Sequence, residues 1–580
     1  MKKTTRFLAA LLALMMTLLL CPLALAGDIS DVFDLDGEPL TINVYSQLAN
    51  YSGLQGGWSA DLLLDKFNVR INIIPDSDGT YETRMASGNL GDIIVWGADG
   101  EQYKNAVEKG MLLDWEEDGL LEEYAPYIAE NYTLALENNR TISGDGAIHG
   151  FGHNVSMDVN GHESFFYTWD IRWDLYQQLG CPEVKDLDGM VDLFLAMKEI
   201  CPTDDNGNET YALSAWPDWD GNMVMYVKAL ATAYYGYDEL GIGLYDTETG
   251  EFYDCLAEDG PYMKCLRFFN KLYQNGLLDP NSMTQTFDQM SEKVKNSGTF
   301  WSIFNYAGSQ AYNTTEHLAE GRYMYAFLPE EATPIAYGLS TTGGNRIWSI
   351  GADTEYPEVC LAIIDYLATP EGSMTMWYGP KGLTWDIDEE GGLYFTELGL
   401  LTNSDTKYDL TGIEFIGPRT GKTYVLKGNF NDGCLQINNT TLSQSALNPD
   451  SAKGETFDKN TWESVLTADS TPVQDAWREW SGFPSAEQYL ENHGYKVMLD
   501  KPGYSEGKKD GELSVKWAQV TKEIVNMSWQ AIYAKSDAAF AGITNVMRNN
   551  AKNYGYDLCV EWSRGQAEEI WAAQHPELGE

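Results

Sequence analysis

Polar and apolar positions in the N-terminal part of the chain follow two alternating patterns. Leu40–Ser46 and Val69–Pro75 are rich in β-branched and aromatic residues and are bounded by loop residues, which predicts strands. Between them, Ser59–Phe67 has apolar residues at helical spacing, and its first serine can cap a helix. Gly91–Trp96 predicts a third strand. Because strand–helix–strand order requires a crossover, we expect these strands to pair in parallel within an α/β fold.

The same patterns continue through the rest of the chain. An aromatic strand leads into a helix near Asp170, and amphipathic helices follow at intervals. From about Val515 the periodicity is largely helical. These further elements are a strand at Ser164–Ile171 and helices at Val191–Ile200, Pro261–Leu278 and Pro357–Ala368.

One short helix is marked at both ends by residues with defined conformational roles. Thr369 is a good N-cap, and Pro370 suits the first helical position, where its missing N–H costs nothing. Gly379 can adopt the positive φ that ends a helix, and Pro380 prevents continuation. This stretch is therefore predicted to have an architectural role.

The first residues predict a secretory signal peptide over residues 1–26. Basic residues at positions 2, 3 and 6 precede the apolar run Phe7–Leu20, and Ala24–Ala26 offers small residues for cleavage before Gly27. The run is too short for a transmembrane helix. Lipid attachment at Cys21 stays open as an alternative, although Leu20 is bulky where such sites prefer small residues.

The charge balance restricts the partners. The chain has 87 acidic and 38 basic residues, a formal net charge of −49, and removal of residues 1–26 would make it −52. So acidic a protein is repelled by nucleic acid and by anionic lipid, which excludes both as expected partners. With 43% apolar and 13% aromatic residues the chain can nevertheless form packed cores, and its length favours two large lobes.

The cysteines leave two interpretations open. Seven remain after the signal peptide, none in a CxxC arrangement, and an odd number prevents complete pairing. Buried free thiols are one interpretation. The other is a partial set of disulfides, for which Cys181–Cys201 and Cys255–Cys265 are the candidate pairs.

Several stretches, in order along the chain, resemble the family 1 extracellular solute-binding proteins of carbohydrate-type ABC importers. Met85–Glu117 resembles the first-lobe signature, in which a strand ends at a ligand loop and a helix and a Gly-Leu-Leu turn follow. Asn270–Pro280 and Ser297–Gly308 resemble the second-lobe helix and strand, and Tyr533–Asp557 resembles the closing helices of the longer sugar-importer branch.

The resemblance implies a two-lobe periplasmic-binding-protein type II fold with several hinge crossovers and a helical C-terminal extension. It implies lobe 1 at residues 27–155 and 331–385, and lobe 2 at residues 156–330 and 386–580. It also implies a monomeric extracellular protein, without cofactor, that captures an oligosaccharide or sugar derivative in the cleft between its lobes. Lobe closure would then deliver the ligand to an ABC permease.

Candidate ligand-binding residues lie where strands end. Sugars present apolar C–H faces and rims of hydroxyls, so a site needs flat aromatic rings together with carboxylates, amides or arginine. In sugar-binding members of the family a Trp and, three residues later, an Asp follow the third strand; Trp96 and Asp99 match them. The other candidates are Tyr45, Gln47, Asn50, Tyr51, Trp216, Asp218, Trp219, Asp220, Trp301, Asn305, Tyr306, Arg346, Trp348 and Trp385.

Each candidate has a plainer alternative, because Trp at a strand end often belongs to the core and Asp often caps a turn. A metal site at His149, His153 and His162 is not favoured, since these lie in a Gly-rich segment without helical spacing. The loop starting at Asp204 resembles a calcium loop of many relatives but lacks the distal carboxylate, which favours a polar turn. Two other functions remain open: a secreted carbohydrate hydrolase using paired carboxylates, and a surface sensor or adhesin on the same fold.

Overall fold

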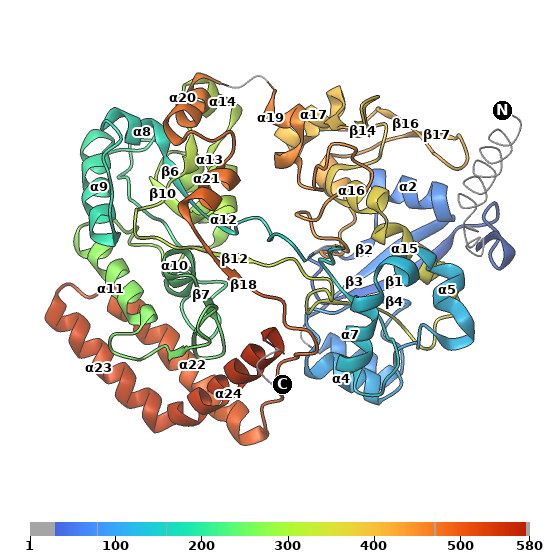
Figure 1. Cartoon of the computed structure of the whole chain (residues 1–580), viewed down its shortest axis with the longest axis horizontal. Coiled ribbons are helices and arrows are strands. Elements are labelled where there is room, and N and C mark those ends of the chain that lie inside the picture. The colour runs from blue at the N-terminus through green and yellow to red at the C-terminus, as the bar shows by residue number, and fades with distance from the viewer. Residues whose placement is uncertain (1–28, 78, 158, 469–470, 576–580) are drawn as a thin grey trace, which may run out of the picture. The chain divides into compact units, whose positions relative to one another are not determined.

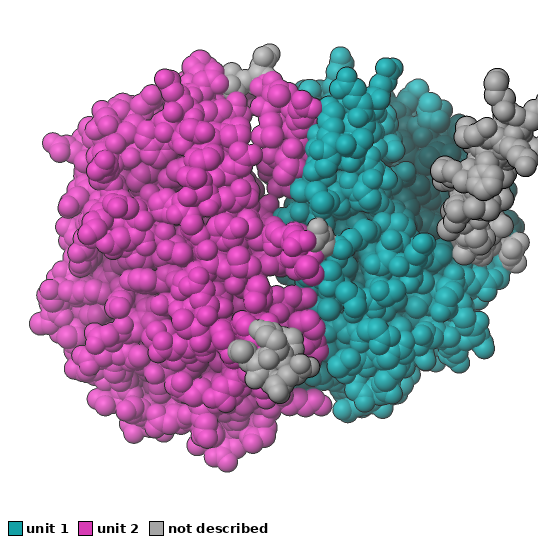
Figure 2. Space-filling view, in the orientation of Figure 1, with its two compact units in different colours: residues 1–158, 340–457 teal, residues 159–339, 458–580 magenta. Residues whose placement is uncertain are grey.

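The computed structural model describes residues 29–77, 79–157, 159–468 and 471–575. The expected signal peptide and Cys21 therefore lie outside the described residues. The chain forms two compact units, which Figure 2 shows in different colours. Unit 1 comprises residues 1–158 and 340–457, and unit 2 comprises residues 159–339 and 458–580. The chain therefore crosses between the units at 158/159, 339/340 and 457/458.

The placement of residues 386–457 differs from the prediction. The sequence assigns this segment to the second lobe, but in the structure it belongs to unit 1. Its aromatic residues pack onto the first helix of that unit: Trp58 stacks on Phe430 with ring centroids 5.7 Å apart, and its indole N–H donates to the Phe430 carbonyl. Buried apolar contact with a segment more than 350 residues away determines the assignment, and no local pattern encodes it.

A six-stranded sheet forms the centre of unit 1. The strands run in the order β2-β3-β1-β4-β13-β5, and β1 pairs in parallel with both β3 and β4, as the crossover argument predicts. In contrast, β13 comes from the return segment and pairs antiparallel with β4. The strands are β1 (Leu40–Ser46), β2 (Gly53–Leu54), β3 (Val69–Pro75), β4 (Ile93–Val95), β5 (Phe151–Gly152) and β13 (Ile347–Ile350).

Ten described α-helices and two hairpins accompany this sheet. The helices are α2 (Trp58–Phe67), α3 (Thr80–Ser87), α4 (Glu101–Glu108), α5 (Leu120–Tyr124), α6 (Pro126–Asn131), α7 (Thr133–Ser143), α15 (Pro357–Ala368), α16 (Pro370–Tyr378), α17 (Glu397–Ser404) and α18 (Phe430–Gly433). The hairpins are β14 (Trp385–Ile387) with β15 (Leu393–Phe395), and β16 (Glu414–Ile416) with β17 (Thr423–Val425).

Unit 2 has three smaller sheets. They are β10 (Trp301–Phe304), β6 (Tyr167–Arg172) and β11 (Met324–Ala326); β7 (Tyr237–Glu239), β8 (Gly243–Asp246) and β9 (Phe252–Asp254); and β12 (Ile335–Tyr337) with β18 (Lys496–Met498). Its shorter or earlier helices are α8 (Trp173–Gln178), α9 (Leu187–Ile200), α10 (Met225–Tyr235), α11 (Pro261–Gln274), α12 (Phe287–Lys295), α13 (Ser309–Tyr312), α14 (Thr315–Ala319), α19 (Glu463–Leu466), α20 (Pro472–Ser481) and α21 (Ala486–His493).

Three long helices end the chain, as the periodicity predicts. They are α22 (Gly511–Ile532), α23 (Asp537–Tyr554) and α24 (Tyr556–Gln574), drawn in red and orange in Figure 1. α22 packs against α11 and α23, and Asn270 of α11 donates to three carbonyls at the end of α22 and just beyond it. Among the helices that the structure describes, none is long and apolar enough to cross a bilayer.

The predicted capping of α16 is confirmed. The Thr369 hydroxyl accepts a hydrogen bond from the Gly372 N–H at 3.1 Å, and Pro370 occupies the first turn. Gly379, with φ of 88°, ends the helix, and a Cβ there would lie within 3 Å of Thr384 and Phe430. By contrast, Ser59 is not the cap of α2, because that helix begins one residue earlier, at Trp58, and Gly57 precedes it.

Replacing the Thr369 cap gives a first testable prediction. Thr369→Ala removes the acceptor for the Gly372 N–H and is expected to lower the free energy of unfolding by about 1 kcal/mol, as for other helix caps. Thr369→Ser keeps the hydroxyl and should retain most of that stability. Urea denaturation of both variants checks the prediction, and an equal loss in the two would show that the threonine methyl, rather than the cap, matters.

The seven described cysteines are free thiols. Neither Cys181–Cys201 nor Cys255–Cys265 forms a disulfide, which corrects that part of the prediction. Burial raises the pKa of the Cys201 and Cys181 thiols, so both favour the neutral form.

Candidate functional site

An aromatic cluster on unit 2 brings together three of the candidates that lie far apart in sequence. Trp216 lies 5.3 Å from Trp219 and 6.2 Å from Tyr306, measured between ring centroids, and Trp219 lies 5.8 Å from Tyr306. Trp216 is buried, whereas the Trp219 side chain is 54% exposed. Two further rings, Phe287 and Phe166, complete what we call the unit 2 aromatic cluster.

Sequence reasoning missed these two phenylalanines. Phe287 stacks on Trp219 with ring centroids 5.7 Å apart and 13° between planes, and Phe166 is 48% exposed beside Tyr306. Phe287 begins α12 after the Thr286 cap, and Phe166 immediately precedes β6. An aromatic residue at an element boundary was the available signal, but such residues are too common in this chain to single out without the fold.

Ring contacts and hydrogen bonds hold the loop that carries Trp219 in place. The buried Trp216 packs edge-on against Tyr226 of α10 and against Phe287. Asp220 accepts hydrogen bonds from the Met225 N–H at 2.7 Å and from the Trp529 indole N–H at 2.6 Å. The loop is therefore held between α10 and α22, and this presents Trp219 outward.

Asp220 has a structural role in holding this loop. Burial raises the pKa of its carboxyl to about 6, and its two oxygens are engaged by Met225 and Trp529. The neighbouring Asp218 is exposed. Of the two aspartates in this loop, Asp218 is the more exposed, and Asp220 is half-buried.

Trp301 lies in the core instead of on a surface. Its ring packs 5.4 Å from Trp169 and 5.4 Å from Phe194, and its side chain is 1% exposed. Trp301 begins the buried strand β10, so its side chain enters the interior. Asn305 and Tyr306 follow the end of that strand and are both half-buried.

In unit 1, polar candidates follow the ends of the neighbouring strands β1 and β4. The Gln47 side-chain oxygen accepts from the Gly97 N–H at 2.9 Å, which joins the two strand ends. Asp99 is buried, Asn50 is exposed, and the Tyr51 hydroxyl donates to the Leu54 carbonyl. The carboxyl ends of parallel strands thus meet at one edge, as expected for this architecture.

Four aromatic candidates of unit 1 are buried in its interior. Each is at most 1% exposed, and each satisfies its polar atom within its own unit, as buried Trp and Tyr usually do. Tyr45 and Trp348 lie on inner strands of the six-stranded sheet, where both faces are covered and bulky residues enter the core. The hydrogen bonds are Tyr45 to Asp76 (2.8 Å), Trp96 to Ser349 (3.2 Å), Trp348 to the Thr440 carbonyl (3.1 Å) and Trp385 to the Gly379 carbonyl (2.8 Å).

The remaining unit 1 candidate is Arg346. Arg346 directly precedes β13 and is exposed, although its neighbour Ile347 is buried. Its backbone carbonyl accepts from the His153 N–H, and burial lowers the pKa of that imidazole to about 4. His149 has both ring nitrogens engaged, by the Leu113 carbonyl and by Asp145.

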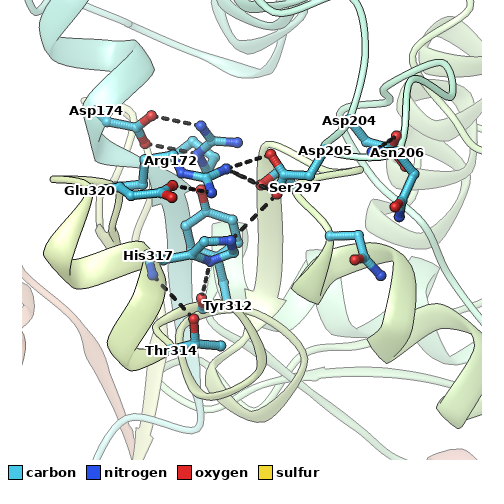
Figure 3. Close-up of polar contacts among 12 residues, drawn as sticks. Arg172, Asp174, Asp204, Asp205, Asn206, Ser297, Tyr312, Thr314, His317 and Glu320 are labelled. Atoms are coloured by element: carbon cyan, nitrogen blue, oxygen red, sulfur yellow. Dashed lines mark hydrogen bonds and ion pairs between the residues drawn. The ribbon is translucent and has the colours of Figure 1, made fainter.

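The loop that resembles a calcium site is arranged as a polar turn. Asp204 accepts from the Asn206 and Asn208 N–H groups at 2.9 and 2.8 Å. Asp205 faces Ser297 and His317 (Figure 3) and also forms an ion pair with Arg322 at 2.8 Å. A guanidinium against this carboxylate supplies the positive charge that a cation would otherwise bring, so these residues do not fit a calcium cage.

Comparison with known proteins identifies a family. The family described as bacterial extracellular solute-binding protein matches residues 63–384, more than half of the chain. Among solved structures, the chain is similar to the alginate-binding protein AlgQ2 without calcium ion, at 16% identity and a TM-score of 0.58. That match covers 92% of this chain and 99% of that one.

A second similar structure is the ABC-transporter substrate-binding protein FusA of Streptococcus pneumoniae in complex with kestose. It is 14% identical with a TM-score of 0.53, over 92% of this chain and 99% of that one. At such identities the likeness shows a shared fold, which is the two-lobe α/β fold of extracellular solute-binding proteins.

One curated relative belongs to a different class of protein and matches this chain only over a limited stretch. The carbamoyl phosphate synthase arginine-specific large chain of Cutaneotrichosporon cutaneum is 28% identical over 196 residues, 33% of this chain. The chain spans 16% of the length of that curated relative.

Proposed function

Since the chain belongs to the bacterial extracellular solute-binding proteins, we propose that it binds an oligosaccharide or sugar derivative outside the membrane. It would then deliver this ligand to the transmembrane permease of an ABC importer. We also propose that it acts as a monomer after cleavage of the signal peptide at residues 1–26, with lipid attachment at Cys21 as the alternative anchor.

The observation that carries the choice of ligand is the unit 2 aromatic cluster. Trp219 is 54% exposed and rests on Phe287, while Tyr306 and Phe166 lie beside it. A contiguous group of exposed apolar side chains on a soluble protein marks a binding site, whereas single exposed apolar residues do not. Flat rings match the C–H faces of sugars, whereas an amino acid or a metal ion gains little from them.

Polar side chains close to candidate rings supply partners for hydroxyl groups. Asp218 is exposed one residue before Trp219, and Asn305 is half-buried one residue before Tyr306. In unit 1, Asn50 and Arg346 are exposed. Carboxylate, amide and guanidinium groups together can both accept from and donate to sugar hydroxyls.

The similar structures support the same class of ligand. One is named for binding alginate and the other is in complex with kestose, and both ligands are saccharides. Both similar proteins bind ligand without being named as enzymes, which agrees with a carrier function. The proposal extends that ligand class to this chain on the strength of its own exposed rings.

A thermal-shift screen against a panel of oligosaccharides tests the proposal. We expect at least one saccharide to raise the unfolding temperature, because a ligand that binds only the folded state stabilises it. Amino acids and short peptides in the same screen serve as controls and should give no shift. If only a peptide or amino acid stabilises the protein, the saccharide assignment is wrong.

The screen also separates a carrier from a hydrolase. After prolonged incubation with the stabilising saccharide, mass spectrometry of the released ligand should show it unchanged and in a one-to-one ratio with protein. Shorter saccharides accumulating in excess of protein would instead support the hydrolase. Loss of uptake of the same saccharide on deletion of the gene would then separate a transport role from a sensor.

A further inference from the structure

Unit 2 contains a cluster of three side chains of types that bind metal ions, none of which belongs to the aromatic cluster. His162, Glu487 and Glu491 each direct one potential ligand atom toward the others, and these atoms all lie within 4.8 Å of one another. Glu487 and Glu491 are one turn apart on α21 and so share a face of that helix. His162 comes from the other side, from the segment before β6.

The imidazole of His162 is held in one orientation. Its Nδ1 lies 2.8 Å from the Glu163 carbonyl oxygen, which can only accept, so Nδ1 carries the proton and donates. The ring packs against Tyr495 and Phe165, with centroids 4.7 and 5.1 Å away, and its side chain is 8% exposed. In the neutral imidazole Nε2 then carries the lone pair, which is the tautomer that metal-binding histidines adopt.

This lone pair faces one carboxylate oxygen, that of Glu491, whereas Glu487 lies on the Nδ1 side of the ring. Nε2 lies 3.5 Å from Glu491 Oε1, and Nδ1 lies 3.9 Å from Glu487 Oε1. A neutral imidazole nitrogen and a carboxylate oxygen are both acceptors, so their approach requires a positive charge, either a proton or a metal ion, between them. The 3.5 Å between Nε2 and Glu491 Oε1 is also about the distance between two ligand atoms of a tetrahedral zinc site. In such a site each ligand lies about 2.0–2.1 Å from the metal.

Backbone groups around the cluster hold its side chains in place. The Glu487 carboxylate accepts from the Phe165 N–H at 3.3 and 3.4 Å, which orients it. The backbone beside His162 is fixed because the Glu163 N–H donates to the Tyr337 carbonyl at 2.6 Å. Such outer contacts orient ligands before a metal arrives.

We infer that His162, Glu487 and Glu491 form a binding site for a divalent transition-metal ion, most suitably Zn²⁺, with water completing the coordination. One imidazole and two carboxylates suit zinc, whereas calcium and magnesium prefer oxygen ligands alone. The ion would link the segment that contains His162 to α21. His162 and Gly338 form a β-bridge, so this segment lies beside the point where the chain leaves unit 2 at 339/340.

Zinc titration of three variants tests the inference independently of any saccharide. The purified protein, first treated with a chelator, is titrated with zinc chloride by calorimetry. We expect one zinc ion per chain and an affinity weakened about tenfold or more in His162→Gln and in Glu491→Gln. Glu568→Gln, which removes an exposed carboxylate elsewhere in unit 2, should bind zinc as the unsubstituted protein does.

Glu491 is exposed, so Glu491→Gln should fold normally. It therefore still tests zinc binding if His162→Gln disturbs folding. X-ray absorption at the zinc edge should show nitrogen and oxygen ligands at about 2.0–2.2 Å and no sulfur at about 2.3 Å. Absence of saturable zinc binding, unchanged affinity in Glu491→Gln, or sulfur ligands from the free cysteines would each overturn the inference.

Discussion

Replacing Trp96 with alanine is expected to destabilise unit 1 by about 3–5 kcal/mol, the range for removing a large buried aromatic side chain. The indole is fully buried, packs edge-on against Tyr103 at 5.8 Å and Tyr81 at 6.3 Å, and donates to the Ser349 hydroxyl at 3.2 Å. Alanine would leave a cavity among these rings and an unpartnered hydroxyl on β13. Because unfolding is expected to remain cooperative within unit 1, chemical denaturation measures the loss directly.

Trp96→Phe is the matched variant. Phenylalanine keeps much of the ring volume but loses the N–H, so its destabilisation should be clearly smaller than that of alanine. Saccharide affinity of the folded fraction should stay close to that of the unsubstituted protein in both variants. If Trp96→Ala instead kept its stability and lost affinity, the indole would face the ligand, as its match to the family's sugar-binding tryptophan predicts.

Trp219→Ala is expected to have the opposite effect, with stability nearly unchanged and saccharide affinity reduced. Its side chain is 54% exposed, so the free energy of unfolding should change by less than about 1 kcal/mol, as for most surface substitutions. If a sugar ring stacks on this indole, its loss should weaken saccharide binding at least about tenfold, which corresponds to about 1.4 kcal/mol. Calorimetric titration with the saccharide found in the screen measures the change.

Trp480→Ala is the control for this experiment. Trp480 is also a partly exposed tryptophan of unit 2, at 36%, but it packs against Trp173 and Tyr176 instead of the aromatic cluster. Its removal should leave saccharide affinity unchanged. Equal affinity in Trp219→Ala and the unsubstituted protein would remove the aromatic cluster from the binding site, even if a saccharide binds elsewhere.

Local patterns were sufficient for several elements of the fold. β1 and β3 occupy the predicted residues, α15 begins at Pro357 and ends at Ala368, and α16 is capped by Thr369 as predicted. These features depend on interactions between residues close in sequence, such as alternation along a strand or a side chain that caps its own helix. The α/β class and the solute-binding family follow from the order of such elements, and both are confirmed.

Residue type alone could not separate a binding tryptophan from a packing tryptophan. Trp96, Trp301 and Trp219 all lie at the end of a predicted element or in a loop, yet the first two are buried and only Trp219 is exposed. Which face of an indole is covered depends on partners that are distant in sequence, such as Ser349 for Trp96 and Trp169 for Trp301.

The sequence by itself determined several helices and strands, the parallel pairing of β1 with β3 and β4, and the family, because each of these is encoded in neighbouring residues or in their order. Only the tertiary structure decided that residues 386–457 belong to unit 1, that Phe287 lies against Trp219, and that His162 meets two glutamates of α21. Each of these depends on contacts between segments separated by tens to hundreds of residues. Hydrophobic burial drives such contacts, and because it is non-directional, a local sequence pattern does not specify which segments meet.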